Sequence, residues 1–298
     1  MTRSRYRGRF APTPSGALHF GSLIAALGSC LDARVHAGFW HLRIEDVDPP
    51  RVVAGSADST LRTLDAFGFE WDGPVVYQRR RGEAYRATLD RLIDAGQVYG
   101  CACSRKTLRE RARIGVDGPV YLGACRDRHL PLKTALRLHV PPTRIVFDDL
   151  LAGRVACDIA HECGDFVLLR ADGVFTYQLA VTVDDAELGI THVVRGADLL
   201  ASTPRQIVLQ QALGYATPAY MHLPVALNDD GSKLSKQTLA APLRDDDPLP
   251  ALLRAAAFLG MDLGCEAGSL AEFWQLAPQR WRRAALPPLR GKRLLTRA

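Results

Sequence analysis

The sequence predicts an α/β fold built on a parallel sheet. Short apolar runs of strand length alternate with longer runs whose apolar residues recur at helical spacing. Strand–helix–strand order favours parallel strands joined by right-handed crossovers. The first two expected strands, residues 6–10 and 38–45, end near Arg9 and Glu45. Because ligands bind outside the carboxyl ends of such strands, these two side chains mark a candidate site.

The first strand leads into a rigid turn and a helix. Two prolines and Gly16 shape the turn, and apolar residues recur at helical spacing over residues 18–27. The start of a helix offers free N–H groups and a positive dipole end, which suit phosphate. His19 can donate to a phosphate oxygen there, and Gly21 lets a nucleotide approach the backbone. The alternative is an ordinary strand–helix turn with a surface histidine.

The later elements continue the alternation. We expect helices over residues 54–68, 81–95, 198–213 and 248–259, and strands over residues 75–77, 166–170, 175–177 and 192–195. The pair Asp172-Gly173 is a hairpin signal between two of these strands. Three aspartates at residues 245–247 are expected to cap the last of these helices. The rest of the chain is expected to form a small helical appendix with an arginine-rich tail over residues 280–293.

Composition and missing fingerprints exclude several classes of protein. No apolar segment follows the basic residues at the N-terminus, so we expect neither a signal peptide nor a membrane span, and we expect a cytoplasmic protein. The net charge of +6 permits a polyanionic partner without requiring one. The sequence lacks both the GxGxxG and the GxxxxGK[ST] fingerprints, so the usual dinucleotide and P-loop modes of binding are not supported.

A group of cysteines begins the segment that follows residue 98. Cys101 and Cys103 form a Cys-x-Cys pair, and Cys125 lies downstream. Zinc favours four soft or borderline ligands in a tetrahedron, so this spacing suggests a zinc site whose fourth ligand is Tyr121, His129 or a water. Spacing alone supports buried free thiols about equally well.

The remaining cysteines are interpreted as packing thiols. The seven cysteines are an odd number in a long chain and fit thiols or ligands better than a disulfide framework. Cys157 and Cys163, with His161 between them, form a second possible cluster. Neither Cys30 nor Cys265 lies near enough in the sequence to complete it.

A second candidate for phosphate binding lies on a loop. A turn signal at residues 228–231 follows an apolar run, and the next residues are Lys233-Leu-Ser-Lys236-Gln237. Two lysines so spaced suit a mobile clamp for phosphates, although charged loops are usually just solvated. Together with the turn before His19, this loop resembles the HIGH-type and KMSKS-type signatures of class I aminoacyl-tRNA synthetases. The departures are Phe20 and Ser22 in the first motif and Gln237 in the second.

Three further strings narrow the resemblance to the glutamyl branch of that family. They are Arg-Phe-Ala-Pro-Thr-Pro-Ser-Gly from residue 9, Arg-Ile-Glu-Asp-Val-Asp from residue 43 and Arg-Gly-Ala-Asp from residue 195. The resemblance covers about residues 5–240 and implies a Rossmann-like class I synthetase catalytic domain. It further implies an inserted zinc-containing subdomain and a small helical C-terminal appendix. The expected parts are residues 1–98 and 171–240 for the two catalytic halves, 99–170 for the insertion and 241–298 for the appendix.

The resemblance also implies roles for individual residues. Activation joins the carboxylate of L-glutamate to the α-phosphate of ATP, so positioning and electrostatics dominate the chemistry. The implied catalytic residues are His19, Lys233 and Lys236, and ATP, accompanied by Mg²⁺, would contact His19, Gly21 and Lys236. The implied glutamate-binding residues are Arg9, Ala11, Thr13, Glu45, Tyr177 and Arg195. Two arginines suit two carboxylates and one acid suits the ammonium group, but the sequence does not assign either arginine to a carboxylate.

One structural zinc per chain is implied at Cys101, Cys103, Tyr121 and Cys125. A tyrosine ligand must lose a proton whose unperturbed pKa is about 10, and a nearby metal charge favours that loss.

The chain resembles the truncated paralogues of glutamyl-tRNA synthetase in one further respect. Only about 60 residues follow Gln237, so we expect no anticodon-binding domain. The resemblance implies a monomer that activates glutamate without tRNA and transfers it to the queuosine base at the wobble position of tRNA(Asp). Residues 99–170 and the arginine-rich tail would then contact tRNA phosphates. The alternatives are a minimal glutamyl-tRNA synthetase that charges the 3′ end and an inactive tRNA-binding paralogue.

Overall fold

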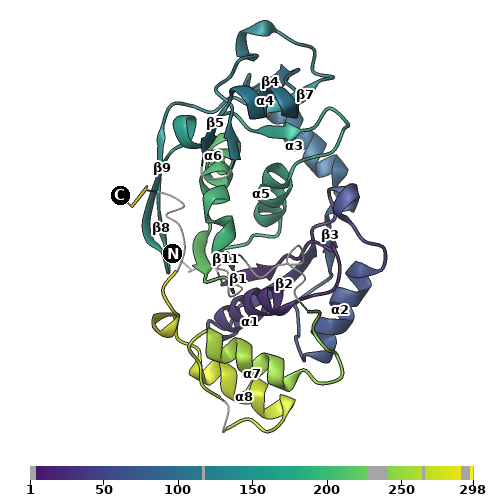
Figure 1. Cartoon of the computed structure of the whole chain (residues 1–298), viewed down its shortest axis with the longest axis vertical. Coiled ribbons are helices and arrows are strands. Elements are labelled where there is room, and N and C mark those ends of the chain that lie inside the picture. Colours follow the sequence, from purple (N-terminus) through teal and green to yellow (C-terminus); the bar gives the residue numbers. More distant parts are fainter. Residues whose placement is uncertain (1–4, 116–117, 227–240, 264–265, 290–295, 298) are drawn as a thin grey trace.

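A parallel sheet forms the centre of the molecule, and its two halves come from distant parts of the chain (Figure 1). The computed structural model describes residues 5–115, 118–226, 241–263, 266–289 and 296–297. In the first half β1 (Arg7–Phe10), β2 (Phe39–Ile44) and β3 (Val76–Tyr77) pair in parallel. In the second half β11 (His192–Gly196) and β12 (Ala219–Leu223) do the same.

The two halves meet between β1 and β11. The Thr191 N–H donates to the Arg7 carbonyl at 2.9 Å, which places β11 beside β1. The strands therefore run in the order β3, β2, β1, β11, β12, and the chain reverses its direction of winding between β1 and β11. The crevice at the carboxyl ends of these two strands is where an open α/β sheet binds its ligand.

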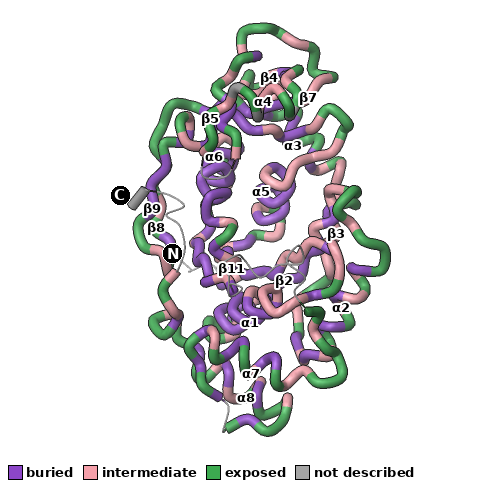
Figure 2. The backbone as a smooth tube through the Cα atoms, viewed as in Figure 1, coloured by how far each residue is buried: buried purple, intermediate pink, exposed green. Residues whose placement is uncertain are grey.

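Helices cover both faces of this sheet. On one face lie α1 (Phe20–Val35), with α7 (Leu249–Phe258) and α8 (Leu270–Arg280) packed behind it, and α2 (Ser56–Ala66) at the side. On the other lie α3 (Gly82–Asp94), α5 (Tyr177–Glu187) and α6 (Thr203–Leu213). The helices nearest the sheet, α1, α5 and α6, are largely buried (Figure 2). No helix in the described part of the chain combines the length and the apolar character that a membrane span needs.

Alternation along β11 shows how the sheet separates two hydrophobic cores. Val193 belongs to the core under α5 and α6, whereas Val194 belongs to the core under α1. Trp40 and Phe273, both fully buried, join the strands to the C-terminal helices in the α1 core. The C-terminal helices therefore share a core with the sheet instead of forming a separate unit.

The segment between β3 and β11 carries antiparallel structure at the far end of the molecule from α7 and α8 (Figure 1). One sheet has the order β10 (Val167–Leu169), β7 (Ala135–Leu138), β4 (Val98–Cys101). Next to α4 (Arg105–Arg111) is a short hairpin of β5 (Arg113–Gly115) and β6 (Gly118–Val120). A longer hairpin of β8 (Arg144–Asp149) and β9 (Gly153–Asp158) returns to the central sheet, where β8 pairs with β12. On its outer side β13 (Thr296–Arg297) pairs with β9.

Most of the expected elements are confirmed, and three differ. The turn at Asp172-Gly173 forms, with Gly173 at φ +84°, but residues 175–177 are not a strand: Phe175 makes one antiparallel bridge and Tyr177 already begins α5. The helix expected from residue 198 is a 3₁₀ segment, Ala197–Ser202, followed by α6. Residues 245–247 do not cap α7, whose N-cap residue is Pro248 and lacks a side-chain cap. Asp246 instead pairs with Arg244 at 2.8 Å.

Candidate active site

A cavity of about 640 Å³ opens at the crevice between β1 and β11. Its wall combines the end of β1, the proline turn, the start of α1 and the ends of β11 and β12. Every described residue that the sequence predicted for glutamate or ATP lines it, namely Arg9, Ala11, Thr13, His19, Gly21, Glu45, Tyr177 and Arg195. Arg9 and Arg195, which are 186 positions apart in the sequence, thus meet in the crevice at the carboxyl ends of β1 and β11.

The proline turn is fixed to the neighbouring strand and presents His19 at the helix start. The Glu45 N–H donates to the Pro12 carbonyl at 3.0 Å, which ties the turn to the end of β2. His19 is the N-cap of α1, and its Nδ1 accepts from the Gly21 N–H at 3.1 Å. A neutral imidazole that accepts at Nδ1 carries its proton on Nε2. His19 therefore offers an N–H donor beside the positive end of the helix dipole.

A buried row of alternating charges forms the Arg9 side of the cavity. Arg9 Nε donates to Asp185 Oδ1 at 3.2 Å, and Arg43 contacts the same oxygen at 2.6 Å. Arg43 also donates to Glu45 Oε1 at 3.1 Å. Burial alone would raise the pKa of Asp185, but Arg43 and Arg9 hold that pKa below its usual range. Burial raises the pKa of Glu45, and the two arginines offset this only in part.

The prediction from the sequence missed Arg43 and Asp185 as members of the site. Arg43 is fully buried, two residues before Glu45 in the string that carries the resemblance. Asp185 ends the apolar run that starts at Tyr177. A charged residue inside an otherwise apolar strand or helix was the available signal, since such residues are almost never fully buried without a partner.

The Arg195 side of the cavity is built differently. Arg195 is buried in β11 and donates to the Tyr177 hydroxyl at 3.2 Å and to Thr203 Oγ1 at 2.9 Å. Its Nε donates to His222 Nε2 at 3.1 Å. His222 in turn contacts Asp149 Oδ2 through Nδ1 at 2.6 Å, and both of these side chains are inaccessible to solvent. Neither His222 nor Asp149 was predicted.

The predicted lysine loop lies outside the described residues, so the roles of Lys233, Lys236 and Gln237 stay predictions. The described chain on either side of this loop reaches the cavity. Ala226 lines the cavity, and Pro242 forms an antiparallel bridge with His19.

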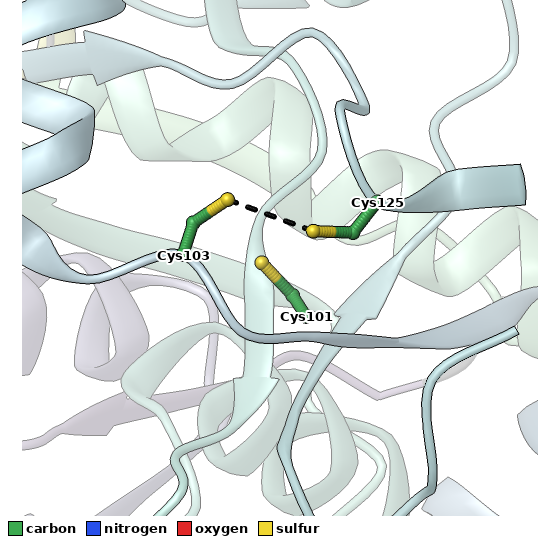
Figure 3. Close-up of side chains that lie close together, drawn as sticks. All are labelled: Cys101, Cys103 and Cys125. Atoms are coloured by element: carbon green, nitrogen blue, oxygen red, sulfur yellow. Dashed lines mark hydrogen bonds between the residues drawn. The ribbon is translucent and has the colours of Figure 1, made fainter. Parts of the chain in front are cut away.

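Cys101, Cys103 and Cys125 converge in the inserted segment (Figure 3), and Tyr121 packs against them. Cys103 Sγ lies 3.6 Å from Cys125 Sγ, and the Tyr121 oxygen lies 3.5 Å from Cys101 Sγ and 3.7 Å from Cys103 Sγ. A tetrahedral zinc with bonds of about 2.3 Å to sulfur and about 2.0 Å to oxygen places sulfurs about 3.8 Å apart and sulfur and oxygen about 3.5 Å apart. The four donor atoms fit zinc. Among the described residues, the group of close ligand atoms holds the three cysteines and does not include His129.

Asp165 holds the loops of this cluster together. Arg126 donates to both of its carboxylate oxygens at 2.7 Å, Tyr99 donates to one of them, and the Asp165 N–H donates to the Tyr121 carbonyl at 2.8 Å. The Arg137 guanidinium lies 4.1 Å from the centre of the Tyr121 ring. Burial and the neighbouring thiols raise the pKa of the Tyr121 hydroxyl, so ligation by its phenolate requires the charge of a metal.

The remaining described cysteines do not form a comparable cluster. Cys157 and Cys163 are buried with their sulfurs 3.8 Å apart, and His161 is exposed and paired with Asp158. Burial raises the pKa of the Cys30 thiol to about 12. These thiols are buried as expected for packing residues, and Cys265 lies outside the described residues.

The structure gives protein partners for two arginines of the arginine-rich tail, whose expected role in phosphate binding stays a prediction. Arg283 donates to both carboxylate oxygens of the buried Asp32 at 2.8 Å, and Arg280 pairs with Glu266 at 2.6 Å. Asp32 lies on α1, so Arg283 fixes the C-terminal segment to the helix that begins at His19. The partner of Arg283 is buried, whereas Arg280 and Glu266 form an exposed pair at the surface.

Comparison with known proteins gives the family. Residues 5–272 match the model of the class I tRNA synthetases (E and Q), catalytic domain. The glutamyl-Q tRNA(Asp) synthetase of Dechloromonas aromatica is 56% identical over 291 residues, which cover 95% of this chain and 96% of that protein. The protein of the same name from Chromobacterium violaceum is 53% identical over 96% of this chain and 97% of its own length.

A solved structure agrees with the sequence relatives. A glutamate tRNA ligase from Elizabethkingia meningosepticum, in complex with its amino acid, is 25% identical and superposes with a TM-score of 0.78. The match covers 95% of this chain, which spans only 66% of that longer chain. The described residues therefore have the class I catalytic α/β fold, and a cysteine cluster lies in the inserted segment. The chain belongs to the class I tRNA synthetases and, within them, to the glutamyl-Q tRNA(Asp) synthetase family.

Proposed function

We propose that the chain activates L-glutamate with ATP in the absence of tRNA and transfers it to the queuosine base of tRNA(Asp). The observation that carries the proposal is the meeting of Arg9, Arg195 and Glu45 in one cavity beside the start of α1. Two cations and one anion complement the two carboxylates and the ammonium group of glutamate. The names of the relatives supply the acceptor, a queuosine-bearing tRNA(Asp).

The activation step needs positioned charge more than it needs covalent catalysis. An oxygen of the glutamate α-carboxylate attacks the α-phosphorus of ATP, a new C–O–P linkage forms, and pyrophosphate leaves with the electron pair of the broken P–O bond. The Nε2–H of His19 and the N-terminus of α1 would stabilise the charge on the phosphates. We assign Lys233 and Lys236 to the departing pyrophosphate, together with the Mg²⁺ that accompanies ATP.

Transfer follows the same logic at a different acceptor. A hydroxyl of the queuosine cis-diol attacks the carbonyl carbon of glutamyl adenylate, an ester forms, and AMP leaves. The proton of the hydroxyl passes to an oxygen of the departing phosphate or to water, which balances the step. Anticodon loops are single-stranded, and proteins read RNA bases directly in such regions. The loop would therefore enter the same cavity that holds the adenylate.

A structural zinc at Cys101, Cys103, Tyr121 and Cys125 completes the proposal. Its support is the agreement between the observed donor distances and those of tetrahedral zinc. When bound, the ion would join residues 101–103 to residues 121–125, and it would take no part in activation. The chain's own contribution is the Asp165 network, which fixes Tyr121 and Arg126 before any ion binds.

The acceptor is tested by labelled glutamate transfer to two otherwise identical tRNA(Asp) preparations, with and without queuosine. We expect label only on the queuosine-containing tRNA, with nuclease fragments placing it in the anticodon loop and periodate treatment of the diol abolishing transfer. An anticodon stem-loop that carries queuosine should accept glutamate more weakly. Label at the 3′-terminal adenosine of unmodified tRNA would overturn the proposal in favour of a conventional synthetase.

A further inference from the structure

We propose that Asp149 and His222 are positioning residues, which aim Arg195 at a substrate carboxylate and leave its positive charge uncompensated. The inference rests on the proposed function, because it assigns Arg195 to glutamate. The three residues come from adjacent strands of the central sheet. His222 is the register partner of Arg195 in the β11–β12 pair, and Asp149 ends β8, the next strand. Their side chains therefore meet by sheet geometry and not by a loop.

The described hydrogen-bond partners of Arg195 are all neutral groups. Its three guanidinium nitrogens contact His222 Nε2, the Tyr177 hydroxyl and Thr203 Oγ1, at 3.1, 3.2 and 2.9 Å. In the part of the chain that the structure describes, no carboxylate forms an ion pair with Arg195. The guanidinium is held in orientation from three sides while its charge is unopposed by these partners.

Geometry fixes the protonation of His222. Its Nε2 faces the N–H donor of Arg195, so a proton on Nε2 would set donor against donor at 3.1 Å. Its Nδ1 faces the Asp149 carboxylate at 2.6 Å and must donate. The ring is therefore neutral, with its proton on Nδ1, as expected where burial lowers the pKa of His222 to about 4. The neutral ring keeps the negative charge of Asp149 one side chain away from Arg195.

Asp149 is itself held rigidly. Its Oδ1 accepts from the backbone N–H groups of Leu151 and Ala152 at 3.0 and 2.8 Å, in the turn between β8 and β9. These contacts fix the orientation of the carboxylate, so that Oδ2 faces Nδ1 of His222. The hairpin of the inserted segment thus determines the orientation of an arginine in the cavity through two buried side chains.

Arg9, on the opposite side of the cavity, lacks this arrangement. Its Nε contacts a carboxylate directly, Asp185 Oδ1 at 3.2 Å, within a row in which two arginines face three acids. Arg9 thus shares its charge between Asp185 and the substrate carboxylate that the proposed function assigns to it. Arg195 has no described carboxylate partner and relies on the substrate for one, so changes behind Arg195 should affect glutamate binding selectively.

The test is the kinetics of glutamate-dependent ATP–pyrophosphate exchange in two His222 variants. His222→Leu removes the acceptor that holds Arg195 Nε, and we expect the KM for glutamate to rise about tenfold to a hundredfold, with kcat and the KM for ATP nearly unchanged. His222→Gln can place its carbonyl oxygen near the position of Nε2, and it should restore most of the affinity. The matched control is Ser29→Ala, which breaks a buried hydrogen bond from Trp40 Nε1 to Ser29 Oγ between β2 and α1, away from the partners of Arg195. It should lower stability and leave the KM for glutamate unchanged.

A rise in the KM for ATP as well as for glutamate would overturn the positioning role. So would a failure of His222→Gln to restore the affinity for glutamate. If the unmutated protein shows no glutamate-dependent ATP–pyrophosphate exchange, that result would instead count against the proposed function. In that case the inference is tested by the ¹⁵N spectrum of the His222 ring, which needs no activity and no foldable variant. We expect a protonated Nδ1 and an unprotonated Nε2 near neutral pH. A proton on Nε2 would contradict the inference directly.

Discussion

The cavity and the cysteine cluster are assembled in opposite ways. The cavity draws its side chains from β1, β2, β11 and β12, and its geometry exists only once the whole sheet has formed. The cluster draws its donors from residues 101–125, and its loops are held by one carboxylate, Asp165. Substitutions in the cavity should therefore affect the chemistry or the entire fold, whereas substitutions in the cluster should affect metal content and local stability.

The largest effect on stability is expected from the row of charges on the Arg9 side. Asp185→Ala leaves Arg9 and Arg43 buried near each other without the carboxylate they share. Breaking a buried ion pair by removing one partner costs about 3–5 kcal/mol. Urea unfolding should show a loss of this size. A loss below about 1 kcal/mol, the range of exposed pairs, would show that water reaches these charges.

The same residue gives a pH dependence with a definite sign. The folded pKa of Asp185 is held below its usual value, so its contribution is present above the unfolded pKa of about 4 and is lost as the pH falls through the folded pKa. Between about pH 5 and pH 2 the unmutated protein should lose stability more steeply than Asp185→Asn does. Parallel curves would contradict the assigned cause.

Replacing His19 by asparagine should lower the rate of ATP–pyrophosphate exchange and leave the stability of the protein unchanged. His19→Asn keeps a side-chain acceptor for the N-terminus of α1, since asparagine is a favoured N-cap, but it removes the Nε2–H donor. We expect kcat for exchange to fall by about 10²–10³, as for loss of one transition-state donor, with an unchanged melting temperature. His19→Ala, which also loses the cap, should be destabilised by about 1 kcal/mol in addition. Equal activity of His19→Asn and the unmutated protein would remove His19 from the chemistry.

The smallest effect on activation is expected from the cysteine cluster. Purified protein should contain about one zinc per chain, and Cys101→Ser should lower both the zinc content and the melting temperature because metal binding is coupled to the local fold. Glutamate-dependent exchange should continue below the melting temperature. Cys30→Ala, at a buried thiol on α1 far from the cluster in sequence, is the control and should leave the zinc content unchanged. A metal-free protein of full stability would refute the zinc site.

The same contrast explains what the sequence could predict. Arg9, Glu45 and Arg195 were predictable because parallel strands end at one edge of a sheet, so each lies near the edge that the topology selects. The spacing of the cysteines is local but fits buried thiols about equally well, so the choice of a zinc site with Tyr121 came from the resemblance. Arg43 with Asp185, and Asp149 with His222, were not predicted because each pair joins residues more than 70 positions apart. Nothing in either local stretch indicates which distant charge it will meet.

Local rules failed where a stronger nearby partner was available. Asp246 was expected at a helix cap but pairs with Arg244, two residues away. Arg283 belongs to the tail that is expected to contact tRNA phosphates, a prediction that stands, and it forms paired hydrogen bonds with the buried Asp32, whose charge needs a partner. Burial explains the partner of Asp32, whereas the pair of Asp246 and Arg244 is exposed and simply joins near neighbours in the sequence.

The central claim is that the cavity between β1 and β11 selects and activates glutamate by itself. The most direct measurement is ATP–pyrophosphate exchange without tRNA, with glutamate, aspartate and glutamine compared at equal concentrations. Aspartate is one methylene shorter, and glutamine lacks the charge that an arginine pairs with. We predict exchange with glutamate and little with the other two. Exchange that requires tRNA, or that proceeds equally well with aspartate or glutamine, would contradict the account.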